Sequence, residues 1–230
     1  MIKFFRKIRK NLLVENKTKK YIQYAIGEII LVVIGILIAL QVNNWNEESL
    51  LNQKATTFLK NLKNDLENDY QQVNRVIGIQ DLRYTFVDSI LKAPKHNSKT
   101  PLKILITGRN ETFFPLIGTY KSGSEEGLIN SISNETLRFA IINLYEHHYT
   151  RLQYNGELND QRHENIEWHS RAYIQHDVLG FNFTVNALEN TDFLKQLTYL
   201  NKFTKIYTDR AILIKTILGD IIQMINAELK

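Results

Sequence analysis

Histidine is the residue type in this sequence that most directly suggests chemistry. Five of the six histidines lie within residues 147–176. They are His147, His148, His163, His169 and His176. On a helix, Asp160, His163, Glu164 and Glu167 would share one face, because their spacings are three and four residues. Imidazole and carboxylate groups placed in this way on the helices of a bundle can bind zinc or another transition metal.

The rest of a metal site is missing from the sequence. The chain has no cysteine, no H-E-x-x-H motif and no second helix carrying Glu-x-x-His. Histidines and carboxylates also occur together on solvated helix faces that bind no metal. We therefore predict no metal ligands, and we interpret these residues as a polar helix face.

Other catalytic signatures are also absent. The segment 122–127 (SGSEEG) resembles a phosphate-binding loop in its glycines, but it lacks the Gly-Lys-Ser/Thr ending and carries two glutamates that would repel phosphate. No G-x-S-x-G motif occurs, although a Ser/His/Asp site assembled in space would leave no such motif. We predict no catalytic residue, no bound cofactor and no enzymatic activity.

The positive charge of the chain is confined to its N-terminus. Residues 1–23 carry eight Lys and Arg against the single Glu15, a net charge of +7, whereas the whole chain is +5. Residues 24–230 therefore sum to −2. A nucleic-acid-binding protein shows basic charge on its folded part, so we predict that the chain binds no nucleic acid.

A long apolar segment follows this basic tail. Residues 29–40 contain no polar side chain, and residues 24–42 are interrupted only by Glu28 and Gln41. As a helix these residues would be about 28 Å long, which matches the hydrocarbon thickness of a bilayer. Tyr21 and Trp45 flank the segment, as in aromatic belts. The alternatives are a cleaved signal peptide, which lacks its A-x-A-like site here, and a buried core helix.

The distribution of basic residues also predicts the orientation. Because Lys and Arg precede the apolar segment, the positive-inside rule places residues 1–23 in the cytoplasm and residues 43–230 outside it. Met1, Phe5, Ile8 and Leu12 would form one apolar helix face, and the basic residues would contact the inner leaflet. Those residues are Lys3, Arg6, Lys7, Arg9 and Lys10. The simpler interpretation is a topology signal alone.

Four residues of the apolar segment are candidates for contacts with another membrane helix. Glu28 is a carboxylate within the membrane segment, where ionisable residues usually have a partner. Gly27, Gly35 and Ala39 share one helix face, and Gly35-x-x-x-Ala39 is a spacing that permits close helix packing. These residues predict a homo-oligomer or pairing with another membrane subunit. The alternatives are a carboxylate that reaches the headgroups and small residues placed by chance.

The N-terminal region resembles a known family. The stretch YAIGEIILVVIGILIALQVNNWNE (residues 24–47), preceded by MIKFFRKIRKNLL, is similar to an uncharacterised family of small single-pass inner-membrane proteins of Gram-negative bacteria. The resemblance is sharp over residues 1–48 and faint afterwards, mainly around residues 120–127. It implies an inner-membrane anchor and a periplasmic helical domain of unknown function, and it assigns no activity and no catalytic residue.

The remaining sequence predicts long helices. All three prolines lie within residues 94–115, so both flanks are free of helix breakers. The first helix is expected over residues 47–91, and its apolar stripe is expected to pack against partner helices as a coiled-coil-like seam. The stripe consists of Leu59, Leu62, Leu66, Tyr70, Val73, Ile77, Gln80, Tyr84, Val87 and Leu91. No linker separates this helix from the membrane segment, so we expect the two to be continuous.

We expect a loop over residues 92–118 that contains one short strand or extended piece at residues 102–107. A short helix at residues 113–122 and a turn at residues 122–127 should follow. A second helix should start after Ser133 or Asn134 and reach His176, in one piece or two. Residues 177–190 should be irregular. A last helix should run from Thr191 to about Leu229 along Leu194, Leu197, Leu200, Tyr207, Leu213, Ile217, Ile221 and Ile225. The predicted fold is mainly α, an antiparallel bundle of three or four long helices.

These features predict a membrane-anchored, non-enzymatic module that binds an envelope protein or a second copy of itself. The tail of 23 residues has no room for a signalling domain. A periplasmic sensor or ligand-binding bundle that acts through a membrane partner is the alternative, and a metal-dependent enzyme is the third hypothesis.

Overall fold

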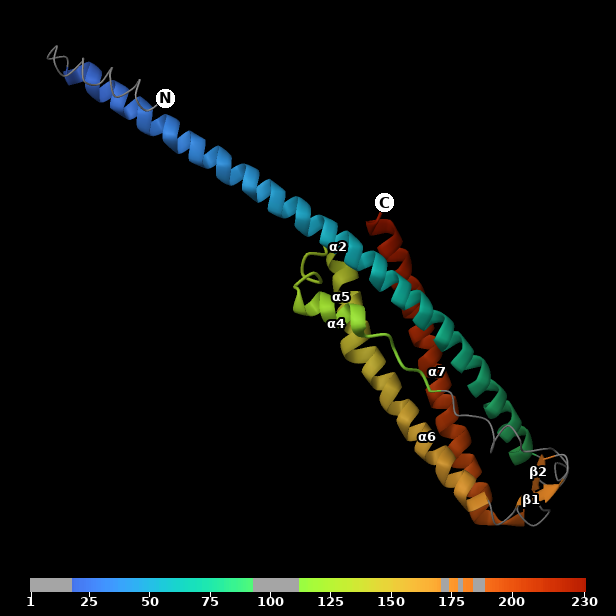
Figure 1. Cartoon of the computed structure of the whole chain (residues 1–230). Coiled ribbons are helices and arrows are strands. Elements are labelled where there is room, and N and C mark those ends of the chain that lie inside the picture. Colours follow the sequence, from blue (N-terminus) through green and yellow to red (C-terminus); the bar gives the residue numbers. More distant parts are fainter. Residues whose placement is uncertain (1–17, 93–111, 171–173, 178–179, 184–188) are drawn as a thin grey trace. The chain divides into compact units, whose positions relative to one another are not determined.

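The computed structural model describes residues 18–92, 112–170, 174–177, 180–183 and 189–230 (Figure 1). Side chains are described for most of these residues, but not for Glu167, His169 or the two strands. The expected strand at residues 102–107 and most of the basic tail lie outside the described residues. The chain divides into two compact units, Met1–Lys54 and Ala55–Lys230.

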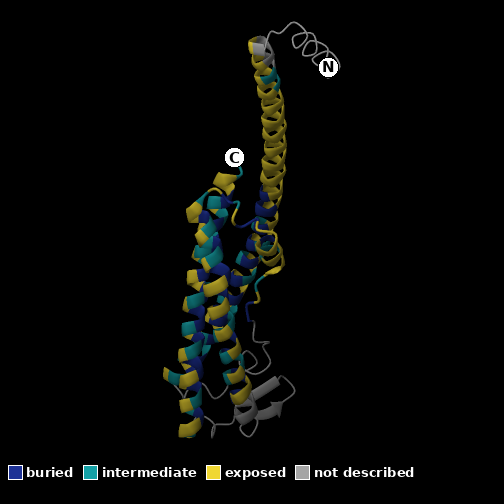
Figure 2. Ribbon diagram, turned by 90° about the vertical axis from the view of Figure 1, so that its left-hand side faces the viewer, coloured by how far each residue is buried: buried dark blue, intermediate teal, exposed yellow. Residues whose placement is uncertain are grey.

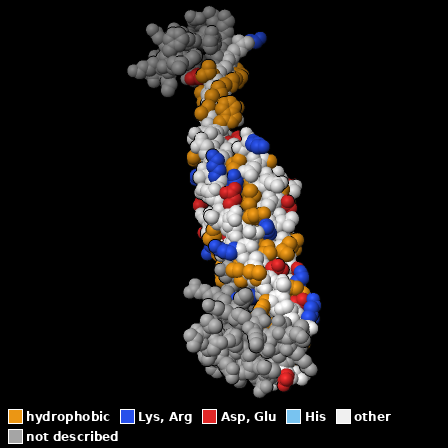
Figure 3. All heavy atoms as spheres, turned by 90° about the vertical axis from the view of Figure 1, so that its right-hand side faces the viewer, with side chains coloured by type: hydrophobic (Ala, Val, Ile, Leu, Met, Phe, Trp, Pro, Cys, Tyr) orange, Lys and Arg blue, Asp and Glu red, His pale blue; other side chains and the backbone are white. Residues whose placement is uncertain are grey.

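The described part of the first unit is one exposed apolar helix. Helix α2 runs from Thr18 to Lys92 without interruption. Within residues 22–42, the large apolar side chains around its circumference are exposed, from Val33 at 47% to Ile29 at 64%. Figure 3 shows hydrophobic side chains following one another along this helix, whereas the surface of the second unit mixes all types. A helix segment that is apolar on every face and is not covered by any other described residue is suited to lipid, and this one is long enough to cross a membrane.

The second unit is a bundle of three long helical rods (Figure 1). The first is α2 from Ala55 onward. The second consists of α5 (Glu135–Asn143), the π-helix η1 (Leu144–Tyr149) and α6 (Thr150–Ser170), which follow one another without a break. The third is α7 (Thr191–Glu228). The mainly helical prediction with three or four long helices is therefore confirmed.

From Leu66 onward, the buried face of α2 is displaced by one residue from the predicted stripe at every second position of that stripe. Buried residues follow spacings of four and three from Leu59 to Ile90, and they include Asp69, Val76 and Arg83. The prediction used Tyr70, Ile77, Tyr84 and Leu91 instead, and these are half-buried. Tyr70, Ile77 and Leu91 do pack against the core clusters. The prediction nevertheless missed the fully buried face, because that face passes through the charged residues Asp69 and Arg83.

Helix α7 contradicts the prediction at Leu213, which is 53% exposed, whereas Ala211, Ile214 and Leu218 are buried. The predicted Leu194 and Ile217 are half-buried and pack against the core clusters. The regular face of α7 contains Asn201, Thr204 and Thr208. Since these polar residues occupy core positions, a pattern that follows only large apolar residues deviates from the buried face of the helix.

A short helix and a turn connect α2 to the second rod. The expected helix at residues 113–122 is shifted: residues 112–117 form neither helix nor strand, and helix α4 spans Gly118–Glu125. Gly123 lies against Phe58, and a Cβ atom there would be 2.1 Å from the Phe58 ring. Gly123 thus allows α4 to pack closely on α2. Gly127 lies in the turn after α4 and has a φ of +74°, a conformation that glycine adopts readily.

A hairpin joins the second rod to α7. Strands β1 (Ile174–Asp177) and β2 (Gly180–Phe183) pair antiparallel, with Ile174 opposite Phe183. The expectation of helix as far as His176 and of irregular chain afterwards was wrong here. Ile, Phe and alternating polar residues in these segments favour strands, and the helix ends at Ser170.

The core of the bundle has two apolar parts with a polar layer between them. The larger apolar cluster joins α2 around Leu62–Val76, η1 and the C-terminal half of α7. The smaller cluster contains Val87, Ile90, Ile166, Phe193, Leu197 and Leu200. Between them, buried polar side chains from all three rods form what we call the polar layer: Gln80, Arg83, Asn159, His163, Asn201 and Thr204. Figure 2 shows the buried residues along the inner faces of the rods.

Candidate functional site

A buried carboxylate organises the region where α2, α4 and η1 meet. Asp69 on α2 is 1% exposed. It accepts hydrogen bonds from Tyr149 Oη at 2.7 Å and from the backbone N–H of Leu116 at 3.1 Å. Burial raises its pKa to about 6, against the opposing effect of these hydrogen bonds, and Asp65 adds to the rise. The carboxylate therefore titrates close to physiological pH.

Residues 112–117 are held in place by side chains rather than by secondary structure. The N–H of Phe113 donates to Tyr207 Oη at 2.9 Å, and the N–H of Phe114 donates to Gln72 Oε1 at 3.2 Å. Tyr145 Oη donates to the carbonyl of Leu116 at 3.3 Å. Backbone groups outside regular structure need such partners. The segment is consequently fixed against all three rods.

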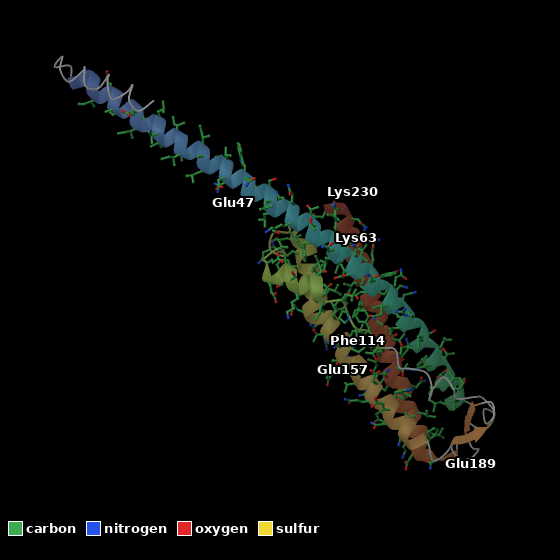
Figure 4. All side chains as sticks on the ribbon, viewed as in Figure 1. Glu47, Lys63, Phe114, Glu157, Glu189 and Lys230 are labelled. Atoms are coloured by element: carbon green, nitrogen blue, oxygen red, sulfur yellow. The ribbon has the colours of Figure 1, made fainter. Side chains whose placement is uncertain are left out.

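This fixed segment exposes three large apolar side chains. Phe114 is 55% exposed, Leu116 43% and Ile117 54%. Phe114 lies on the segment that precedes α4 (Figure 4). We call Phe114, Leu116 and Ile117 the apolar platform. Contiguous exposed apolar surface is typical of interaction sites, and these three residues are close neighbours in the sequence.

The π-helix η1 places tyrosines beside the platform. Tyr145 and Tyr149 are buried and contact each other edge to face, with ring centroids 5.0 Å apart. Tyr120 of α4 stacks on Tyr145 with centroids 4.1 Å apart and planes 1° from parallel. Burial raises the pKa of all three phenols, that of Tyr120 to about 12, so they are neutral. Single π-helical turns occur frequently at functional sites.

A pocket of about 420 Å³ opens between α4, η1 and the start of α6. Its lining combines tyrosines, apolar groups and charges of both signs. The lining residues are Pro115, Ile117, Tyr120, Lys121, Ser124, Glu125, Tyr145, Glu146, Tyr149, Thr150 and Gln153. Tyr120 Oη donates to Glu146 Oε1 at 2.9 Å. This volume lies within the usual range of ligand pockets, about 300–1,000 Å³.

The polar layer is the second unusual region. His163 is 6% exposed, and its Nε2 has no hydrogen-bond partner among the described residues. Burial, with Arg83 nearby, lowers the pKa of His163 to about 4, so the imidazole is neutral. Asp160 next to the layer accepts a hydrogen bond from Thr112 Oγ1 at 2.7 Å, and burial raises its pKa.

The family DUF6090, a family of unknown function, matches residues 28–204. This chain belongs to it. No curated protein and no solved structure matches the chain.

The DUF6090 match covers more than the N-terminal resemblance did. It begins at Glu28 within the apolar segment, and it includes Asp69, the platform, the pocket and the polar layer up to Asn201 and Thr204. It does not include the basic tail or Gly27. The tail residues Lys3, Arg6, Lys7, Arg9 and Lys10 lie outside the described residues as well. The site described above therefore lies in the part of the chain that defines the family.

The histidines of this DUF6090 chain do not converge in the described part of the structure. His147 and His148 contact each other edge to face on η1, and His148 hydrogen-bonds Asn143 at 3.1 Å. His163 points into the core instead. The side chains of His169 and His176 lie outside the description. Among the described residues, no group of three His, Asp or Glu side chains is placed to hold a metal ion.

The membrane-helix candidates lie on an isolated helix. Around Gly27 and Gly35 the space is open, with no atom within 4 Å of an added Cβ. Ala39 is exposed and Glu28 is half-buried. The described structure thus leaves the face of Gly27, Gly35 and Ala39 accessible to another helix or to lipid.

Sequence reasoning missed Asp69 and the burial of Arg83 and His163. A signal for the two α2 residues was present, because Leu62, Asp69, Val76, Arg83 and Ile90 follow one another at intervals of seven. A heptad register followed through its polar members would have placed both in the core.

Proposed function

We propose that this DUF6090 chain is a membrane-anchored, non-enzymatic helical module that binds another protein of the cell envelope through its apolar platform. The observation that carries the proposal is the platform itself. Phe114, Leu116 and Ile117 are about half exposed while the backbone beneath them is fixed by hydrogen bonds to Asp69, Gln72 and Tyr207. A rigid apolar surface binds a partner at low cost in conformational entropy.

We further propose that the anchor lies in the inner membrane of a Gram-negative bacterium, with the tail in the cytoplasm and the bundle in the periplasm. Its support is the apolar helix together with the basic residues that precede it. The sequence contains no cysteine, so single introduced cysteines can report topology.

In intact cells, a membrane-impermeant maleimide is expected to label Glu189→Cys but not Lys3→Cys. Labelling of Lys3→Cys should require permeabilisation of the inner membrane. Glu189 is exposed and is labelled in Figure 4. The reverse pattern would contradict the orientation, and extraction of the chain by carbonate would contradict the anchor.

The platform predicts where the partner binds. A photocrosslinking amino acid at Phe114 or Ile117 is expected to link one heterologous protein in native membranes. The same group at Leu82, which is 64% exposed on α2, serves as the matched control and should not link it. Leu116→Asp should abolish the link from position 114, because a buried charge in an apolar interface is costly.

Mass spectrometry of the linked species decides the outcome. A crosslink yield from position 82 equal to that from position 114, or an unchanged yield with Leu116→Asp, would contradict binding through the platform. Links only between copies of this chain would replace the envelope partner with self-association.

A periplasmic ligand-binding bundle is the second candidate function. The pocket of about 420 Å³ favours it, since its volume and its mixed lining suit a small molecule. A bundle of this kind would transmit its state through a membrane partner.

A further inference from the structure

We infer that the pocket beside the platform takes a guanidinium group, namely an arginine side chain of the protein that docks on the platform. The inference rests on the proposed function and adds the chemistry of the partner. It is carried by the juxtaposition of two carboxylates, a stacked tyrosine pair and part of the platform around one pocket.

The carboxylates supply the charge. Glu125 of α4 and Glu146 of η1 both line the pocket, and neither forms an ion pair with a described residue. Tyr120 Oη donates to Glu146 Oε1 and so orients this carboxylate. Its other oxygen is available to a donor. The pocket therefore offers acceptors for a cation at two points of its wall.

The tyrosines supply a flat surface. Tyr120 lines the pocket and is half-buried, and it is held in place by stacking on the buried Tyr145 with ring centroids 4.1 Å apart. An aromatic face attracts a cation, and a planar guanidinium both stacks on such a face and forms paired hydrogen bonds with a carboxylate. Arginine satisfies both features of the pocket, whereas an ammonium group cannot stack.

The platform indicates that the group arrives on a protein. Ile117 belongs to the platform and also lines the pocket, together with Pro115. An arginine has an apolar stem and a charged end. Its methylene groups would follow Ile117 and Pro115, and its guanidinium would reach Glu146. A protein already bound on the platform would present the side chain from this side.

Lys121 would repel a bound cation, so it predicts the direction in which a change of charge alters binding. It lines the same pocket and is exposed. Removing its charge should therefore strengthen the binding of a guanidinium, whereas removing the charge of a glutamate should weaken it. A ligand that carried its own carboxylate would show the opposite response to Lys121.

The test uses the full-length protein in lipid nanodiscs, with N-acetyl-arginine methylamide as the probe and its neutral citrulline analogue as the control. We expect the arginine probe to bind with a dissociation constant in the millimolar range, because a single partly exposed side-chain contact gives only weak affinity. The citrulline analogue should bind more weakly. The readout is calorimetry, checked by the shift of fluorine signals from fluorotyrosine-labelled protein.

Three variants test the residues. Glu146→Gln is expected to weaken binding of the arginine probe about two- to fivefold, and Lys121→Gln to strengthen it by a similar factor. Glu146→Gln retains an acceptor for Tyr120 and should remain folded. Glu157→Gln is the matched control, because Glu157 is exposed on α6 and does not line the pocket (Figure 4). It should leave binding unchanged.

Several results would overturn the inference. Binding of the citrulline analogue as tight as that of the arginine probe would contradict recognition of a guanidinium group. Binding of the arginine probe by Glu146→Gln as tight as by the wild type would contradict it as well. Tighter binding of putrescine than of the blocked arginine would assign the pocket to a free amine. In each case crosslinks from Phe114 would persist if the proposed function holds, so the failure of one is distinguishable from the failure of the other.

Discussion

Asp69→Asn is expected to stabilise the bundle at neutral pH, raising its free energy of unfolding by about 2 kcal/mol at pH 7.5. Burial raises the pKa of Asp69 from 3.8 to about 6. Ionising this carboxyl in the folded state therefore costs about 3 kcal/mol relative to the unfolded chain. Asparagine removes that cost. It also weakens the hydrogen bonds from Tyr149 and Leu116, which offsets about 1 kcal/mol of the gain.

The pH dependence of this effect has a definite sign. Between pH 3.8 and about 6 the folded state binds the proton of Asp69 more tightly than the unfolded state does. Stability from this residue is therefore present at low pH and is lost as the pH rises through that window. The advantage of Asp69→Asn should grow from about pH 5 to pH 7.5 by between one and two kcal/mol.

Urea unfolding of the full-length protein in detergent, followed by far-ultraviolet circular dichroism, measures both quantities. Asp220→Asn is the matched control, because Asp220 is exposed on α7. A variant less stable than the wild type at pH 7.5 would show that the hydrogen bonds of Asp69 outweigh its burial.

His163→Leu is expected to stabilise the bundle most at acid pH, where the free energy of unfolding should rise by about 3 kcal/mol at pH 5. Burial beside Arg83 lowers the pKa of His163 from 6.5 to about 4. At pH 5 the unfolded chain binds a proton here and the folded state does not, which costs the wild type about 2 kcal/mol. Leucine also removes a buried Nε2 without a hydrogen-bond partner, for about 1 kcal/mol at any pH.

The sign for His163 is opposite to that for Asp69. Stability from neutral His163 is present above pH 6.5 and is lost as the pH falls towards about 4. The two windows overlap and their effects are similar in size. The free energy of unfolding of the wild type should therefore vary little between pH 5 and 7.5 through these two residues. Each substitution removes one of the two effects, so the variant should show the pH dependence of the residue that remains.

The same unfolding assay distinguishes these slopes. With His163→Leu, stability should fall as the pH rises to about 6; with Asp69→Asn, it should rise with pH up to about 6.5. His147→Leu, a substitution at an exposed histidine of η1, is the matched control. Parallel profiles for both variants would contradict the assignment of either residue.

The sequence predicted the helices better than it predicted their buried faces. The proline-free flanks, the cap at Asn134 and the long apolar periodicity placed the three rods, and Asn134 does accept a hydrogen bond from the N–H of Leu137. Hydrophobic pattern alone failed where Asp69, Arg83 and Asn201 occupy core positions. Asp69, for example, accepts a hydrogen bond from Tyr149 on η1, which is 80 positions away in the sequence.

The candidate site was beyond sequence reasoning for a related reason. The platform depends on Gln72, Asp69 and Tyr207 binding the backbone of residues 112–117, contacts that span 42, 47 and 94 positions. The pocket depends on the meeting of α4 with η1, where Tyr120 and Glu146 are hydrogen-bonded across 26 positions of sequence. No local motif encodes either feature.

The polar layer also limits how the bundle behaves as a mechanical unit. The larger and smaller apolar clusters share three helices but no side chain. Tight interlocking of apolar side chains is what makes a core respond as one body. The layer interrupts that interlocking, so we expect the part of the bundle around the smaller cluster to open independently of the part around the larger cluster. The docking surface belongs to the larger part.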